Sequence, residues 1–132
     1  MDFKGKKVLV TGASGGIGGA IVKKFLSLNA SVLGTGTNSE KLNSLKKEFP
    51  NLLTEQFNIS NHEKIDEFID KVFSNLGGLD ILINNAGITK DNLSLRMKRD
   101  EWQKVIDVNL TSTFYLCKSA IKKMLKSKYG RI

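Results

Sequence analysis

Two patterns of apolar positions alternate along this chain: short apolar runs, and longer segments with apolar residues at helical spacing. The apolar runs that predict strands are Lys7–Thr11, Ser31–Thr35, Leu52–Phe57 and Leu79–Ile83. Within the last of them, Ile81–Ile83 is apolar without a break, which is typical of a strand covered on both faces. Strands that alternate with helices in this way predict an α/β fold with a parallel sheet.

The segments between these runs predict helices. Four helices are expected. The first is Ile17–Leu28, and the second follows Thr37 and is ended by Pro50. The third is Ile65–Leu76, ended by Gly77-Gly78, and the fourth is a long stretch from about Asp100 to Lys128. Thr37 and Glu40 have the spacing of a capping box before the second helix. Ser60 and Glu63 have the same spacing before the third.

These elements predict a doubly wound parallel sheet with strand order 3-2-1-4 and helices on both faces. Gly130–Ile132 has the pattern of the first residues of a fifth strand. The sequence has no internal repeat, low-complexity segment or inter-domain linker, so residues 1–132 are expected to be part of a single domain. The expected sheet is therefore incomplete, with strands 1–4 and the start of strand 5.

The charge of the chain is strongly positive, +8 from 21 Lys and Arg against 13 Asp and Glu. Such an excess could attract a polyanion, an acidic protein or a phosphorylated ligand. The lysines are spread over several segments instead of being concentrated on one face with aromatic residues, as nucleic-acid binding requires. Solvated helix faces account for most of them, and we expect no nucleic-acid partner.

Several features point to the cytoplasm. No apolar run approaches the roughly 18 to 20 residues that a membrane helix needs, and the first residues lack a signal-peptide pattern. The single cysteine, Cys117, has no partner for an internal disulfide, which suits a reducing compartment. The only histidine, His62, stands at an expected helix start and is expected on the surface. A zinc site is excluded by the number of available ligands.

A glycine-rich turn, Gly12-Ala13-Ser14-Gly15-Gly16-Ile17-Gly18, joins the first strand to the first helix. Gly12 permits a tight reversal, and Gly18 permits close packing of helix and strand. The backbone N–H groups of Ser14–Ile17 would face a phosphate at the positive end of the helix. The turn has neither the Gly-Lys-Ser/Thr of a nucleotide triphosphatase nor the Gly-x-Gly-x-x-Gly fingerprint. A glycine-rich turn without a ligand remains the alternative for this motif alone.

Two motifs together resemble the short-chain dehydrogenase/reductase family. Thr11-Gly12-x-x-x-Gly16-x-Gly18 is similar to the family's glycine motif, and Asn84-Asn85-Ala86-Gly87 is similar to the motif at the end of its fourth strand. Both motifs follow expected parallel strands, where ligands bind in open α/β sheets. The resemblance implies a Rossmann-type, NAD(P)-binding domain. The residues it implies at the cofactor are Gly12, Ala13, Ser14, Gly15, Gly16, Ile17, Gly18, Asn85, Ala86 and Gly87.

The end of the second strand bears on the choice of cofactor. NAD-selective enzymes usually have an Asp or Glu there, but Gly34–Asn38 contains no carboxylate. Thr37 and Asn38 could donate hydrogen bonds to a 2′-phosphate, so NADP(H) is favoured. NAD remains open, because many NADP-dependent relatives have an arginine where Gly15 stands.

Asn58 and Ile59 follow the third strand and are expected at the adenine. Many members of the family have an Asp at the first of these positions, in contact with adenine. An asparagine could accept the same hydrogen bond through its side-chain oxygen. The alternative is an asparagine that merely ends a strand.

One branch of the family, the 3-oxoacyl-(acyl-carrier-protein) reductases of fatty-acid synthesis, is similar over the second half of the chain. The similar stretches are Gly87–Leu93, Leu95–Lys98, Glu101-Trp102, Val108–Leu110 and Tyr129–Ile132. This resemblance implies NADPH-dependent reduction of a 3-oxoacyl thioester delivered by acyl carrier protein, in a cytoplasmic parent enzyme that is a homotetramer. Acetoacetyl-CoA reductases share much of the pattern. A nucleotide-binding module without chemistry is the alternative from another class.

Most of the family's catalytic residues have no match. The family uses a serine and a Tyr-x-x-x-Lys, but Tyr115 is followed four positions later by Ser119, and Tyr129 lies too near the end of the chain. Only the asparagine of the proton relay has a match, Asn109, and a polar residue inside a helix is its alternative. We therefore expect a chain truncated after the fourth β-α unit and inactive by itself, because general acid catalysis needs a positioned donor.

A basic cluster lies near the end of the last expected helix. Its members are Lys122, Lys123, Lys126, Lys128 and Arg131, and we call them the C-terminal basic cluster. The resemblance implies an acidic carrier protein as partner, so a basic patch beside the mouth of the active site would steer it. Solvated lysines on a helix that packs in an oligomer are the alternative.

Overall fold

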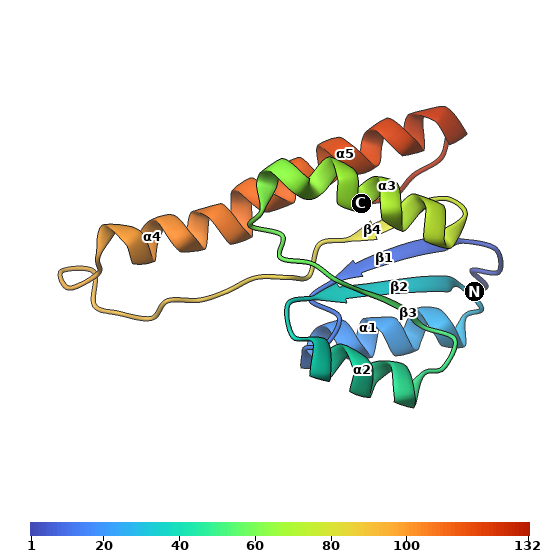
Figure 1. The fold of residues 1–132 in the computed structure, drawn as a ribbon, viewed down its shortest axis with the longest axis horizontal. Coiled ribbons are helices and arrows are strands. Elements are labelled where there is room, and N and C mark those ends of the chain that lie inside the picture. Colours follow the sequence, from blue (N-terminus) through green and yellow to red (C-terminus); the bar gives the residue numbers. More distant parts are fainter.

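A four-stranded parallel sheet forms the centre of the molecule, and the computed structural model describes all residues, 1–132 (Figure 1). The elements are β1 (Lys7–Thr11), α1 (Gly16–Ser27), β2 (Ser31–Gly36), α2 (Ser39–Glu48), β3 (Leu53–Gln56), a short 3-10 turn (His62–Lys64), α3 (Ile65–Leu76), β4 (Ile81–Ile83), α4 (Arg99–Ile106), a π turn (Asp107–Thr111) and α5 (Ser112–Ser127). The strand order is β3-β2-β1-β4, and every pairing is parallel. The predicted α/β fold and strand order are confirmed.

The core lies in two layers, one on each face of the sheet. Alternate residues of β1 serve both layers, because successive side chains of a strand point to opposite faces. Leu9 packs in the layer with α3 and α5, whereas Val8 and Val10 pack in the layer with α1 and α2. All three are fully buried, and Figure 1 shows the two pairs of helices on opposite sides of the sheet. The unbroken apolar strands are thus explained by cover on both faces.

Neither expected capping box is present. The second helix begins one residue later than predicted, because Asn38 caps it: its Oδ1 accepts the N–H of Lys41 at 3.0 Å. Before α3, the hydroxyl of Ser60 donates to the side chain of Asn58 at 2.7 Å instead of capping a helix. The other predicted ends agree, since α2 stops two residues before Pro50 and Gly77 ends α3 with a φ of 71°.

The long helical stretch is interrupted at its middle. The sequence predicts one helix from about Asp100 to Lys128, and the chain is helical over nearly that range, but Asp107–Thr111 forms a π turn between α4 and α5. A π turn contains one residue more than an α turn and is often found at functional sites. Figure 1 shows α4 extending beyond the sheet past the ends of its strands. No helix combines the length and apolarity needed to span a bilayer.

The last residues return to the sheet beside β4. Arg131 makes a parallel bridge with Ile81, and its carbonyl accepts the N–H of Leu82 at 3.0 Å. Gly130–Ile132, where the sequence predicts the start of a fifth strand, thus makes one bridge to β4.

The C-terminal basic cluster lies at the opposite edge of the sheet from the glycine-rich turn. Arg131 makes its parallel bridge with Ile81, the first residue of β4. The Nζ of Lys6, just before β1, lies 3.7 Å from the ring centroid of Tyr129. A crossover helix carries the chain back to the amino ends of the strands, so the end of α5 must lie there. The prediction that this cluster borders the mouth of the site is wrong within one copy of the chain. Lys122 and Lys123 instead pair with Asp66 and Asp70 of α3.

Candidate functional site

A hollow of about 360 Å³ opens at the carboxyl ends of the strands. Seven of the predicted cofactor residues line it: Gly12, Ser14, Thr37, Asn58, Ile59, Ala86 and Gly87. These residues come from four separate segments of the chain, which the parallel sheet brings to one edge. Open α/β sheets bind their ligands at this edge.

A hydrogen-bond network centred on Thr11 and Asn85 joins the two sequence motifs. Thr11 Oγ1 accepts the N–H groups of Asn85 and Ala86 at 3.1 and 3.0 Å, and its hydroxyl lies 3.3 Å from the carbonyl of Ile83. The side-chain amide of Asn85 donates to the carbonyls of Thr11 and Gly12, both at 3.1 Å. We call this the Thr11–Asn85 network. It fixes the glycine-rich turn against the loop that follows β4.

Two glycines of the turn are required by this packing. Gly12 has a φ of +62°, and a Cβ there would lie 2.9 Å from the Cα of Ala86. A Cβ on Gly18 would lie 2.0 Å from the carbonyl oxygen of Gly12. By contrast, a Cβ on Gly16 would meet nothing within 4 Å, so the absence of a side chain there leaves open space before the helix.

The N-terminus of α1 has the properties of a phosphate site. Its N-cap residue, Gly15, provides no side-chain hydrogen bond, and the first turn contains no acidic residue. The carbonyl of Gly15 accepts the N–H of Gly19 at 2.8 Å, so the first three N–H groups of the helix have no partner within it. Free N–H groups and the helix dipole favour an anion at this position. The residues present therefore fit the phosphates of a dinucleotide.

The other residues of the turn surround the hollow without lining it. Ala13 is fully buried, and its N–H donates to the carbonyl of Thr35 at 3.0 Å, so it supports the turn from beneath. Gly15 and Gly16 are exposed at the rim, and Ile17 exposes an apolar side chain beside them. Gly18 is buried under Gly12.

The end of β2 provides an uncharged wall. Thr37 is exposed in the lining, and the hollow has no carboxylate among its residues. Its one charged residue is Lys104 of α4, which sequence reasoning did not single out. No local signal could have identified Lys104, because only the path of α4 past the sheet brings it to the hollow.

The side-chain oxygen of Asn58 is already hydrogen-bonded within its own segment. Its Oδ1 accepts two hydrogen bonds from Ser60, one from the N–H at 3.0 Å and one from the hydroxyl at 2.7 Å. A carbonyl oxygen has two lone pairs, so both are in use. In this structure the Nδ2 donor is therefore the group of Asn58 left for a ligand, and a contact of Asn58 with adenine stays a prediction.

Asn109 lies on the π turn and holds the loop after β4. Its Oδ1 accepts the N–H of Ile88 and its Nδ2 donates to the carbonyl of Ile88, both at 2.8 Å. A Cβ on Gly87 would lie 3.3 Å from the same Oδ1. Both ends of the amide are thus engaged with one wall of the hollow, and a role for Asn109 in a proton relay stays a prediction.

His62 stands at the start of the 3-10 turn, and its side chain is half-buried at the surface. Its Nε2 lies 3.0 Å from Ser112 Oγ and 3.2 Å from the carbonyl oxygen of Asp107. Both partners belong to the π turn region, 50 and 45 residues further along the chain, so no local pattern around His62 indicates them. No three His, Cys, Asp or Glu side chains are grouped as a metal would require.

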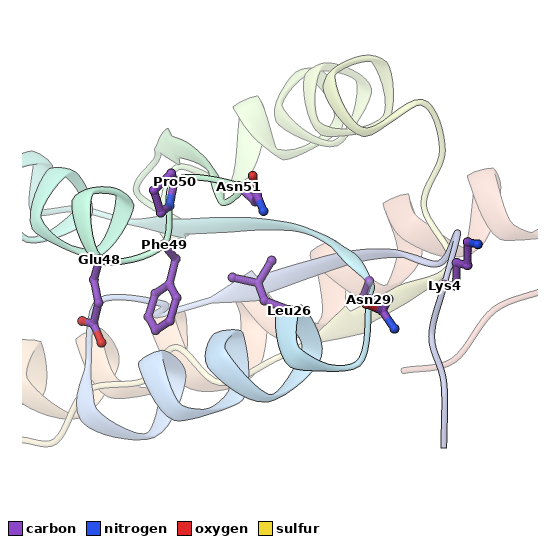
Figure 2. A pocket seen from close by; sticks show the side chains of 8 residues that line it. Lys4, Leu26, Asn29, Glu48, Phe49, Pro50 and Asn51 are labelled. Atoms are coloured by element: carbon purple, nitrogen blue, oxygen red, sulfur yellow. The ribbon is translucent and has the colours of Figure 1, made fainter.

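A second hollow, of about 560 Å³, opens at the opposite edge of the sheet (Figure 2). Leu26 and Phe49 form its apolar middle, and Lys4 and Glu48 lie toward its two ends in Figure 2. Polar groups do not converge there on a common point, unlike in the hollow beside the glycine-rich turn. The hollow at the carboxyl edge is therefore the candidate site.

Most groups at the candidate site are of the kind that bind a ligand. Its lining contains no His, Tyr, Cys, Asp or Glu, and Lys104 is its one ionisable side chain. The geometry provides backbone donors, an apolar rim and one lysine. These groups could hold and orient a nucleotide.

The chain matches the family model described as short chain dehydrogenase over residues 6–132. The chain belongs to the short-chain dehydrogenase family. The 3-oxoacyl-[acyl-carrier-protein] reductase FabG of Rickettsia typhi (strain ATCC VR-144 / Wilmington) is 46% identical over 136 residues, which is 100% of this chain and 54% of the relative. The protein of the same name from Escherichia coli (strain K12) is 41% identical over 100% of this chain and 54% of the relative. The protein of that name from Aquifex aeolicus (strain VF5) is 39% identical over 100% of this chain and 55% of the relative. This short-chain dehydrogenase chain thus spans about half the length of the curated relatives it matches.

Proposed function

We propose that the hollow beside the glycine-rich turn binds NADP(H), and that residues 1–132 are the N-terminal part of a single cofactor-binding domain. The observation that carries this proposal is the meeting of two motifs at one edge of the sheet, joined by the Thr11–Asn85 network. The pyrophosphate would lie at the N-terminus of α1, over Gly15 and Gly16. The adenosine would lie between Thr37 and Asn58.

The preference for NADP(H) over NAD(H) is supported by charge. The hollow contains Lys104 and no carboxylate, so nothing repels a 2′-phosphate there. Thr37 and Asn38 follow β2, where an NAD-selective enzyme usually has an acid. The cofactor, when bound, supplies a hydride. The groups of this chain bind it, orient it and fix the loop at Ala86–Ile88 beside it.

For the whole protein we propose reduction of 3-oxoacyl-acyl-carrier-protein to the 3-hydroxyacyl form, in the fatty-acid synthesis of the cytoplasm. The names of the relatives that match the full length of this chain support this substrate. The serine and the Tyr-x-x-x-Lys of the family are absent from residues 1–132, so by themselves these residues are proposed to bind cofactor without turnover.

We further propose that the parent enzyme is a homotetramer. The support is a set of apolar side chains left exposed on α4, the π turn and α5: Trp102, Leu110, Phe114, Ile121 and Leu125. An exposed apolar patch of this kind commonly marks a protein interface.

Two measurements test the proposal. Fluorescence titration of the chain with NADPH and with NADH should show tighter binding of NADPH, and a clear preference for NADH would contradict the cofactor assignment. NADPH oxidation with a 3-oxoacyl thioester should be detected for a chain extended to the length of the relatives and not for residues 1–132. A positioned acid is typically worth about 10²–10⁴-fold in rate. Turnover by the short chain would mean that the acid lies among residues assigned here to structure.

A further inference from the structure

A partly buried contact joins the segment after β3 to the π turn. His62 Nε2 lies within hydrogen-bond distance of Ser112 Oγ and of the Asp107 carbonyl. The Ser112 hydroxyl donates to that carbonyl at 2.7 Å, and the Ser112 N–H donates to it in the bond that closes the π turn. Ser112 is fully buried, and the ring centroids of Tyr115 and His62 lie 5.5 Å apart. A single side chain from outside the helix therefore contacts both residues that close the π turn.

The π turn determines which way Asn109 faces. An extra residue in one turn offsets the helix on either side of it by about 100° relative to a continuous α-helix. α5 is anchored in the core by Leu116 and Ala120, so this offset fixes the side chains that precede it. Asn109 lies in the middle of the turn and makes two hydrogen bonds, each of 2.8 Å, to the backbone of Ile88. If the turn relaxed to α geometry, Asn109 and Ile88 would no longer be opposite one another.

Both ends of this series of contacts lie at the candidate site. Ser60 and Asn58 line the hollow in the segment that leads to His62, and Gly87 and Ile88 line its other wall. His62 thus stands between two walls that are far apart in sequence. We propose that His62 is a positioning residue: by holding the π turn through Ser112 and Asp107, it keeps Asn109 on Ile88 and so sets the place of the Gly87–Ile88 wall. The effect on ligand binding rests on the proposed function, whereas the link from His62 to Ile88 does not.

Amide hydrogen exchange, followed by NMR on the 132-residue chain without ligand, tests this link. His62→Leu should speed exchange of the Ile88 N–H by about tenfold, the factor expected for loss of one hydrogen bond. The reference is the Lys41 N–H, which also donates to an asparagine Oδ1, at 3.0 Å, but lies at the start of α2. Its exchange should not change. Equal rates for Ile88 in both proteins, or a parallel rise at Lys41, would overturn the proposal.

Conservative variants separate positioning from folding. The Nε2 of glutamine can take the place of histidine Nε2, so His62→Gln should restore slow exchange at Ile88, whereas the shorter His62→Asn should not. Ser112→Ala should behave like His62→Leu, and combining the two should add little, because both remove the same contact. If His62→Leu does not fold, the comparison of Gln with Asn decides alone, and equal behaviour of these two would refute the role of Nε2.

A titration with NADPH then separates this inference from the proposed function. If the wild-type chain binds NADPH, His62→Leu should weaken binding by about the same tenfold factor. Unchanged binding together with faster exchange at Ile88 would remove the effect on the ligand. Failure of the wild-type chain to bind NADPH would overturn the proposed function and leave the exchange result standing as the test of positioning.

Discussion

Removing the hydroxyl of Thr11 should destabilise the chain more than any other change of a single oxygen atom to a methyl group at this edge of the sheet. Thr11→Val keeps the shape of the side chain but removes one oxygen, which accepts two N–H groups and lies within donating distance of a carbonyl. The residue is only 1% exposed, so water cannot replace the lost partner. The N–H of Ala86 would be left without an acceptor, and the N–H of Asn85 would keep only the carbonyl of Ile83, at 3.1 Å.

The magnitude follows from these two donors. A buried donor left unsatisfied costs about 1–3 kcal/mol, and Ala86 is half-buried, so the lower part of that range applies to its N–H. The Asn85 N–H loses one of its two acceptors and adds a smaller cost, so we expect Thr11→Val to lower the free energy of unfolding by about 2 kcal/mol. Thr35 gives a matched control, because it pairs with Thr11 in register, is also 1% exposed, and makes one hydrogen bond, a donation to the carbonyl of Glu55 at 2.7 Å. Thr35→Val should cost about 1 kcal/mol.

Urea unfolding followed by circular dichroism measures both values. Thr11→Ser, which keeps the hydroxyl and loses only a methyl group, should cost about 1 kcal/mol and shows whether the oxygen or the packing is responsible. If Thr11→Val is no more destabilising than Thr35→Val, the Thr11–Asn85 network does not fix the glycine-rich turn, and the reasoning fails.

Three further changes have defined outcomes. Gly18→Ala places a Cβ 2.0 Å from a carbonyl oxygen and should cost about 3 kcal/mol in unfolding, whereas Gly16→Ala, with open space at its Cβ, should fold normally and lose NADPH affinity in a fluorescence titration. Thr37→Asp should weaken NADPH binding roughly tenfold and favour NADH, since a carboxylate repels a 2′-phosphate; unchanged selectivity would show that Thr37 lies away from that group. The pKa of Asp66 is lowered, first by a hydrogen bond from Ser119 and then by Lys122 and Lys118, from its usual 3.8. The stabilisation that the Asp66 carboxylate contributes is therefore complete above pH 3.8 and is lost as the pH falls through the lower pKa of the folded state. In thermal unfolding, Asp66→Asn should destabilise the chain near pH 7 and have little effect at about pH 2.

The sheet and its core could be predicted from the sequence because burial determines them. The unbroken run Ile81–Ile83 and the spacing of Ile65, Phe68 and Ile69 have few alternatives that bury the same side chains. Helix starts were less predictable. Thr37 and Asn38 are both good capping residues one position apart, and the choice between them is settled by which one reaches Lys41.

The candidate site was predictable only where its residues follow strands. The end of each parallel strand lies at one edge, so Gly12, Asn58 and Ala86 could be brought together from topology alone. Lys104 and Val108 reach the same hollow from a helix whose path no local pattern indicates. The π turn and the partners of His62 depend on contacts across 45 or more residues, where local spacing carries no information.

The central place of β1 has a consequence for how this chain is made. Of the four strands, β1 is synthesised before the others, but one of its two neighbours, β4, comes much later, and 74 residues separate Thr11 from Asn85. Until β4 is synthesised, one edge of β1 is unpaired, and an unpaired apolar edge invites association with other chains. The nascent protein therefore passes through a period in which this central strand has an unpaired edge. Synthesis of β4 and the loop after it ends that period, because Ile81–Ile83 pair with β1 and Asn85 secures the turn.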